Sequence, residues 1–149
     1  MTVEAQITIN GTRPEIWKVM TNIQVAADII SGIEQIEIFH QPESDLVGLK
    51  WRETRMYFGK PSAIDKWITE AVEKSFFKTR AEMEGYIFTT THTLSGNEGN
   101  LLLTSSHETI PVGLLAQIKS LPMIFFKGML KKAILQDLMD LKAVVEKRK

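Results

Sequence analysis

The sequence predicts an α+β fold in which a curved, seven-stranded antiparallel sheet wraps around one long C-terminal helix. Residues 121–146 place apolar side chains three or four positions apart, as one face of a helix requires. Most of the preceding chain alternates apolar and polar residues with period two, as half-buried strands do. Short turns join these strands and favour antiparallel neighbours. Such a sheet can cover a long helix only by curving around it.

Length and composition fit one globular domain over residues 1–149, long enough for a substantial core. The formal net charge is zero, so no general attraction to nucleic acid and no nucleic-acid partner is expected. The chain has no cysteine, which excludes disulfides, thiolate nucleophiles and cysteine-based zinc sites. It shows neither a signal peptide nor an apolar run of transmembrane length, so a cytoplasmic location is expected.

A strand and two short helices are expected at the N-terminal end. Residues 2–10 alternate as a half-buried strand does. Thr12 can then cap a helix, and Glu15, three residues later, completes a capping box. A second short helix is expected over about residues 22–30, with Gly32 suited to end it.

Six further strands are expected where the period-two pattern continues. They are residues 33–40, 47–58, 62–72, 76–83, 86–94 and 101–110. Residues 95–100, rich in glycine and asparagine, give the strongest hairpin signal. A short helical turn is expected near residues 114–119. The apolar stripe of the final helix consists of Met123, Phe126, Leu130, Ile134, Leu138, Leu141 and Val145.

This order of elements resembles the START-like or Bet v 1-like helix-grip superfamily (SRPBCC), in its polyketide cyclase/dehydrase and lipid-transport branch. The stretches that carry the resemblance are residues 12–17 (TRPEIW), 47–55 (VGLKWRETR) and 130–146, which contains DLMDLK. The resemblance spans nearly the whole chain, but none of these stretches is a catalytic signature. It implies a helix-grip fold that holds a small apolar or amphipathic molecule between sheet and helix. Some members are enzymes, and many only bind or carry.

The strand at residues 47–58 supplies the first candidate site residues. If its alternation holds without a bulge, Trp51, Glu53, Arg55 and Tyr57 share the concave face. Burying either charge alone is costly, so a pair or a polar ligand group is expected. Arg55 could orient a carboxylate, phosphate or enolate oxygen, with Glu53 holding it or acting as a base. The alternative is a structural ion pair, or a rim pair in water after a bulge.

The last hairpin supplies a second set. Centring it on residues 96–100 directs two rows of side chains inward: Tyr86, Phe88, Thr90, His92 and Leu94, and Leu101, Leu103, Ser105, His107 and Thr109. The two histidines could exchange protons or hydrogen-bond a ligand carbonyl. Alternatively, they are core histidines satisfied by threonine or serine neighbours. A metal site of His92, His107 and Glu53 has no supporting ligand spacing, so no metal and no cofactor is expected.

The final helix is expected to add four ligand contacts that lie over the concave face. The predicted ligand-binding residues are Trp51, Glu53, Arg55, Tyr57, Phe88, Thr90, His92, Leu103, Ser105, His107, Phe126, Met129, Leu130 and Ala133. Residues 111–118 are unusually apolar for a segment broken by proline and glycine, so they form a lid, a lipid-touching lip or a buried loop. Residues 111–132 contain four lysines and no acidic residue. These lysines could face an anionic partner, or they could simply be exposed to solvent.

The primary hypothesis is a protein that binds a small hydrophobic or amphipathic molecule in an internal cavity, as a carrier, sensor or store. One alternative is an enzyme similar to a polyketide cyclase or dehydratase, which uses arginine, glutamate and histidine groups in the cavity. Another is a lipid or quinone carrier that docks transiently on a membrane through residues 111–126. The sequence leaves the oligomeric state open.

Overall fold

The computed structural model describes residues 1–57, 59–114 and 126–147. Its elements are β1 (Thr2–Ile9), α1 (Arg13–Thr21), η1 (Ile23–Val25), α2 (Ala26–Ile29), β2 (Ile33–His40), β3 (Lys50–Tyr57), β4 (Lys60–Val72), β5 (Phe76–Met83), β6 (Tyr86–Asn97), β7 (Asn100–Pro111) and α4 (Lys127–Lys147). The predicted α+β class and order of elements are confirmed.

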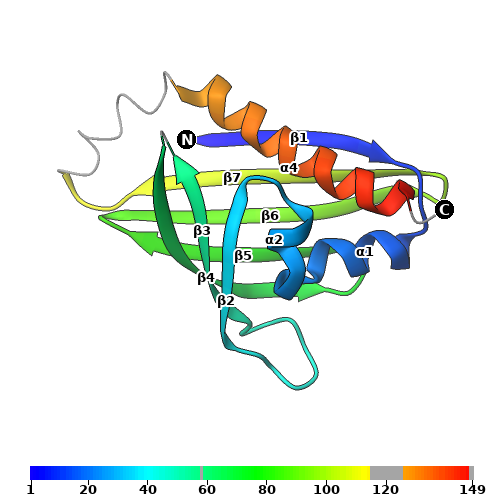
Figure 1. The fold of residues 1–149 in the computed structure, drawn as a ribbon, viewed down its shortest axis with the longest axis horizontal. Helices are drawn as coiled ribbons and strands as arrows, with labels where there is room; N and C mark the ends of the chain where they lie inside the picture. Colours follow the sequence, from blue (N-terminus) through cyan, green and yellow to red (C-terminus); the bar gives the residue numbers. More distant parts are fainter. Residues whose placement is uncertain (58, 115–125, 148–149) are drawn as a thin grey trace.

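The seven strands form one antiparallel sheet in the order β1-β7-β6-β5-β4-β3-β2. Figure 1 shows that the sheet curves and that α1, α2 and α4 all lie on the same, concave side. Helix α4 packs mainly against β1, while α2 packs against β2. The three helices therefore cover the concave face of the sheet.

The N-terminal helices differ in part from the prediction. The capping box is present, since the Glu15 amide donates to Thr12 Oγ1 and the Thr12 amide donates to Glu15 Oε1. The second helix is shorter than predicted: η1 and α2 are each about one turn, and the extended conformation of Ile30 ends α2. Gly32 lies beyond that end and beside the Arg55 side chain, so its predicted role as the helix stop is wrong.

Several strand boundaries also differ from the prediction. β3 begins at Lys50 rather than residue 47, because Gly48 has a φ of +97° and residues 47 and 48 form a turn. β6 and β7 extend to Asn97 and Asn100, which pair across a two-residue loop. Gly99 in that loop has a φ of +84°, as tight hairpin turns require. The predicted hairpin is confirmed.

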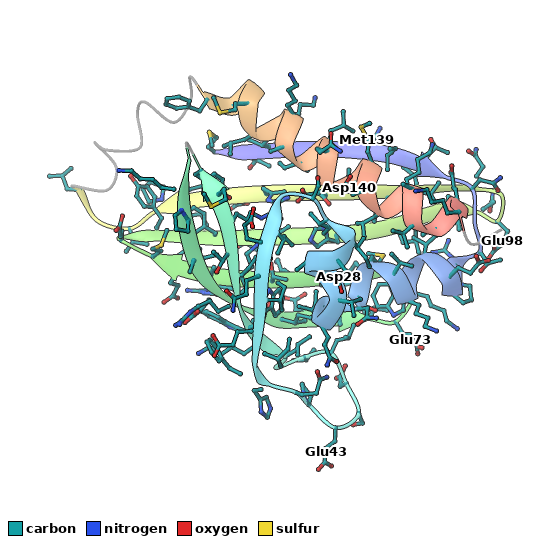
Figure 2. The ribbon with its side chains drawn as sticks, in the orientation of Figure 1. Asp28, Glu43, Glu73, Glu98, Met139 and Asp140 are labelled. Carbon is teal, nitrogen blue, oxygen red and sulfur yellow. The ribbon has the colours of Figure 1, made fainter. Side chains whose placement is uncertain are left out.

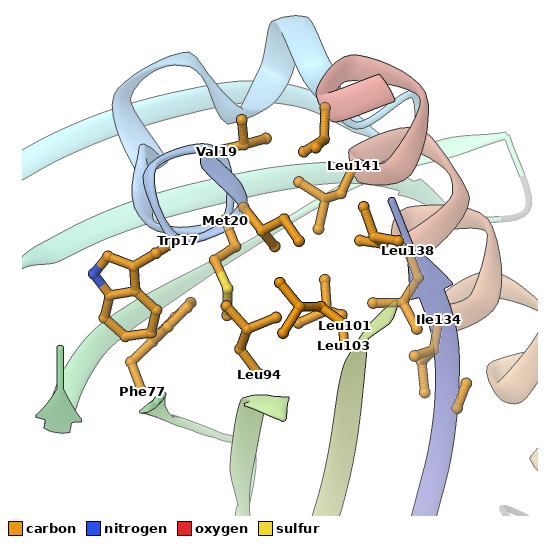
Figure 3. Packing of buried hydrophobic residues seen from close by; sticks show 14 of the residues in the cluster. Trp17, Val19, Met20, Phe77, Leu94, Leu101, Leu103, Ile134, Leu138 and Leu141 are labelled. Carbon is orange, nitrogen blue, oxygen red and sulfur yellow. The ribbon is translucent and has the colours of Figure 1, made fainter. Parts of the chain in front are cut away.

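The core joins the inward side of the sheet to α1 and α4. Figure 3 shows Met20 of α1 and Ile134, Leu138 and Leu141 of α4 packed near Leu103 and its neighbours on the strands. Trp17 meets Phe77 edge to face, with ring centroids 6.1 Å apart. Burying these side chains is what holds the helices on the sheet.

The apolar stripe of α4 is buried only in its second half. Ile134, Leu138, Leu141 and Val145 are buried, whereas Phe126 is 47% exposed and Leu130 is 36% exposed. Among the described residues, the first part of the predicted stripe is therefore not covered. Met123 and nearly all of the predicted turn at 114–119 lie outside them. None of the described helices is both long and apolar enough to cross a membrane.

Candidate functional site

A cavity of about 80 Å³ lies between the concave face of the sheet and the helices α1, α2 and α4. Its apolar lining residues are Val19, Met20, Ile23, Ala26, Ile29, Ile30, Ile33, Trp51, Phe77, Leu103, Ile134, Leu138 and Leu141. Its polar and charged lining residues are Asn22, Glu53, Arg55, Lys66, Thr79, Thr90, His92, Ser105, His107 and Asp137. The cavity thus combines an apolar wall with a group of polar side chains, most of them on the strands.

Glu53 is the centre of the polar group. Trp51 Nε1 donates to its Oε1 at 3.4 Å, while Arg55 Nε and Lys66 Nζ donate to its Oε2 at 2.8 and 3.0 Å. Burial alone would raise the pKa of Glu53, but the charges and hydrogen bonds of Lys66 and Arg55 outweigh it and lower the pKa to about 2. Glu53 is therefore an ionised, fully engaged carboxylate.

Arg55 also connects the sheet to the final helix. Its Nη1 and Nη2 donate to the two carboxylate oxygens of Asp137 at 3.3 and 2.8 Å, a bidentate pair between β3 and α4. Burial raises the pKa of Asp137, and the hydrogen bond from Arg55 opposes that rise. Burial would lower the pKa of Arg55. Its hydrogen bonds and ion pairs with Asp137 and Glu53 outweigh this effect and raise the pKa above its ordinary value, so the guanidinium stays charged.

The two cavity histidines have hydroxyl partners on the neighbouring strand. His92 Nδ1 lies 2.7 Å from Ser105 Oγ, and His107 Nδ1 lies 3.4 Å from Thr90 Oγ1. The rings meet edge to face, with centroids 6.2 Å apart. Burial, reinforced by neighbouring positive groups, lowers the pKa of His92 to about 4 and that of His107 to about 3. Both imidazoles are therefore neutral at physiological pH.

In the last hairpin Thr90 lies opposite His107 and His92 lies opposite Ser105, and all four line the cavity. The hairpin closes between Asn97 and Asn100 rather than being centred on residues 96–100. No bulge interrupts the pairing of β3 with β4, so Glu53 and Arg55 share the concave face with Trp51. Among residues 1–57, 59–114 and 126–147, no group of three histidine, aspartate or glutamate side chains is arranged to hold a metal ion.

The predicted ligand contacts fall into two groups. Those that line the cavity are Trp51, Glu53, Arg55, Thr90, His92, Leu103, Ser105 and His107; those outside its lining are Tyr57, Phe88, Phe126, Met129, Leu130 and Ala133. Tyr57 is 51% exposed at the end of β3, and Phe88 lies on β6 two residues before Thr90. Phe126 precedes α4, whereas Met129, Leu130 and Ala133 lie on α4 before Ile134; all four are exposed.

Lys66 and Asp137 are the two charged lining residues that the predicted ligand contacts leave out. The pattern of the final helix was interpreted as placing Asp137 off the apolar stripe, and this is wrong, because Asp137 follows Ile134 by three residues and precedes Leu141 by four, the spacing of one helix face. Lys66 falls midway between Ile64 and Ile68 in the alternation of β4, so the same inward face was available to it. Spacing therefore places both on inward faces, but it does not reveal the partners on other elements that stabilise a charge there.

A second, more open hollow of about 390 Å³ borders the β2–β3 loop and Trp17. Figure 2 shows Glu43 at the tip of that loop, and Glu73 also borders the hollow. No basic side chain is among the described residues that line it. We therefore assign the candidate site to the enclosed cavity.

Comparison with known proteins identifies the fold. No family model and no curated protein sequence matches the chain. Among solved structures, a protein from Thermus thermophilus matches with a TM-score of 0.81 and 9% identity over 100% of this chain and 99% of that one. A START superfamily protein from Mycobacterium smegmatis matches with a TM-score of 0.78 and 12% identity, covering 99% of both chains. The Zhui aromatase/cyclase from Streptomyces sp. R1128 matches with a TM-score of 0.76 and 16% identity, over 99% of this chain and 94% of that one.

Identities this low establish the fold and nothing finer. The chain has the helix-grip fold of START-like proteins, as the sequence resemblance predicted.

Proposed function

We propose that this helix-grip protein binds a small hydrophobic or amphipathic molecule in the cavity between the sheet and α4, as a carrier, sensor or storage protein. The observation that carries the proposal is the lining: thirteen apolar side chains surround a connected group of polar ones. Sites for small molecules have this composition, in which apolar walls supply affinity and a few polar groups fix orientation.

The size of the cavity constrains how a ligand is held. At about 80 Å³ it has room for a few water molecules. Pockets that enclose a drug-sized ligand measure roughly 300–1,000 Å³. A ligand of that size therefore requires α1, α2 or α4 to move away from the sheet. We propose that the ligand-bound form is expanded in this way.

Native mass spectrometry of freshly purified protein, followed by denaturing extraction, tests the proposal. We expect a stoichiometric apolar or amphipathic molecule to be retained and released on denaturation. The variant Ile30→Trp adds bulk to the cavity wall and should lose it, whereas Leu135→Trp, at a 37% exposed position that does not line the cavity, should keep it. Retention of the same molecule by both folded variants would contradict binding in the cavity.

A second candidate function is a cyclase or dehydratase acting on a carbonyl substrate. The observation that favours it is that His92, His107 and Lys66 line the same cavity, because imidazole and amino groups can transfer protons to and from a substrate. Arg55 is a weaker choice for polarising an oxygen, since Glu53 and Asp137 already engage its Nε, Nη1 and Nη2. Unchanged turnover in a His92→Gln/His107→Gln variant would exclude this assignment. Docking on a membrane through residues 111–126 stays a prediction, because most of that segment lies outside the described residues.

A further inference from the structure

The charges that line the cavity cancel. Among the described lining residues, Glu53 and Asp137 carry negative charge, and Arg55 and Lys66 carry positive charge. The two histidines add none at physiological pH. The lining is therefore electrically neutral before any ligand arrives.

These four charges also engage one another directly. Arg55 contacts both carboxylates at 2.8 Å, and Lys66 contacts Glu53 at 3.0 Å. Among the described residues that are not exposed, every side-chain nitrogen or oxygen that has essentially no accessible surface has a hydrogen-bond partner. A charged ligand group would therefore meet no unpaired charge of opposite sign and would have to share a counter-ion with one of these pairs.

The hydrogen-bonding capacity left over suits an uncharged group. Within the part of the chain that the structure describes, each histidine uses its Nδ1 only, and Lys66 donates one hydrogen bond of its three. A neutral imidazole Nε2 can donate or accept, and Lys66 can donate further. A hydroxyl or carbonyl oxygen can use these groups without disturbing the four-charge network.

We infer that the cavity selects an uncharged amphipathic ligand, an alcohol, phenol or ketone whose oxygen meets Lys66, His92 and His107, over the carboxylate of the same skeleton. The inference rests on the proposed function and names the ligand class of that site. A carboxylate would add one uncompensated negative charge to a balanced, partly buried group. We expect it to bind at least about tenfold more weakly than its neutral counterpart, a difference of about 1.4 kcal/mol.

Calorimetric titration at pH 7 with 2-naphthol, which is neutral, and 2-naphthoate, which is ionised, tests the inference. The wild-type protein should prefer 2-naphthol by about tenfold or more. Glu53→Gln and Asp137→Asn each give the lining a net positive charge, so each should move the preference toward 2-naphthoate by about tenfold. Two variants are used because Glu53 has three hydrogen-bond partners and its loss could unfold the protein. Glu70→Gln makes the same charge change at an exposed position outside the lining and should leave the preference unaltered.

The outcomes separate this inference from the proposed function. Equal or tighter binding of 2-naphthoate to the wild-type protein, abolished by Ile30→Trp, would overturn the charge selection and leave cavity binding in place. A preference for 2-naphthol that stays the same in folded Glu53→Gln and Asp137→Asn would also overturn it. Binding of neither probe to the wild-type protein or any variant would overturn both.

Discussion

Glu53 accepts hydrogen bonds from Trp51, Arg55 and Lys66, and Arg55 in turn binds Asp137. Each partly buried charge is thus next to an opposite one. Removing one member would leave an opposite charge unpaired in a partly buried place. That costs far more free energy than the ion pair contributes relative to apolar side chains of similar volume. The ion pairs are therefore weak evidence for stability, and under the proposed function they form the polar part of the ligand-binding cavity.

The neutral histidines predict a protein whose stability falls in acid. Burial lowers the pKa of His92 to about 4 and that of His107 to about 3, against 6.5 in the unfolded chain. Between pH 6.5 and 4 the unfolded state binds more protons, so the free energy of unfolding falls as the pH falls. We expect a loss on the order of 2 kcal/mol per histidine between pH 7 and 4. Glu53, with its pKa lowered to about 2, adds a loss below about pH 4.5, and Asp137, whose pKa burial raises, offsets part of it.

Urea unfolding at several pH values from 7 to 4 measures this slope. His92→Gln/His107→Gln should flatten it, because glutamine keeps hydrogen-bonding groups without titrating. His40→Gln, at an exposed position, serves as the control. An unchanged slope in the double variant would contradict burial of the two neutral imidazoles.

Some inward-facing side chains could be predicted from the sequence, and others could not. Period-two alternation placed Glu53 and His107 on the concave face because side chains of a regular strand alternate strictly. Lys66 and Asp137 were missed because isolated charges normally lie in solvent. Their inward positions become favourable only through partners on other elements, Glu53 and Arg55, which no local pattern contains.

At the scale of elements, two aspartates of α4 hold it to the rest of the cavity wall. Asp137 pairs with Arg55 of β3, and Asp140 Oδ2 accepts from the amide and hydroxyl of Ser31, between α2 and β2. Figure 2 shows Asp140 on α4 and Asp28 on α2. In the proposed expanded form, a movement of α4 away from the sheet would have to break or stretch these contacts.

Loss of the Asp140 contact should therefore loosen this side of the cavity. We expect Asp140→Ala to speed amide hydrogen exchange at Ser31 and to lower the free energy of unfolding by about 1–2 kcal/mol. Asp28→Ala removes an acid from α2 that has no part in this contact and should do neither. Exchange measured by mass spectrometry with peptide-level resolution checks this, and equal exchange in both variants would contradict it.

The connection between β1 and α1 passes very close to the end of α4. A Cβ atom placed on Gly11 would lie 2.8 Å from Cγ1 of Val145, which is 1% exposed. Gly11→Ala should therefore destabilise the protein by about 1–3 kcal/mol through overpacking.

A double-mutant cycle isolates that contact. Val145→Ala removes the atom that the new methyl group would strike, so it should cost less in the Gly11→Ala background than alone. Urea unfolding of the four proteins gives the coupling energy. Strict additivity would show that the close approach is not what excludes a side chain at position 11.

The length of α4 that the sheet covers could not be predicted from the helix sequence. A stripe at spacing three to four tells which side of a helix is apolar, and this holds for Ile134, Leu138 and Leu141. It does not tell how far the opposing surface extends. The predicted helix contacts consequently lie before the part of α4 that lines the cavity, which begins at Ile134 and includes Asp137.

At the scale of the whole molecule, a curved sheet, three helices and a balanced group of charges enclose one small cavity. Element order and short turns were enough to predict this architecture, because antiparallel neighbours follow from connection length. The volume of the cavity depends on how side chains from strands and helices far apart in the chain pack together, so it could not be predicted from local patterns.

Imidazole NMR spectra recorded during a titration with 2-naphthol test the central claim, that a ligand lies inside this cavity. The chain has three histidines, of which His92 and His107 line the cavity and His40 is exposed on β2. The account predicts that the signals of His92 and His107 shift with one common dissociation constant while that of His40 stays in place. Saturable binding of 2-naphthol that leaves His92 and His107 unchanged would contradict it.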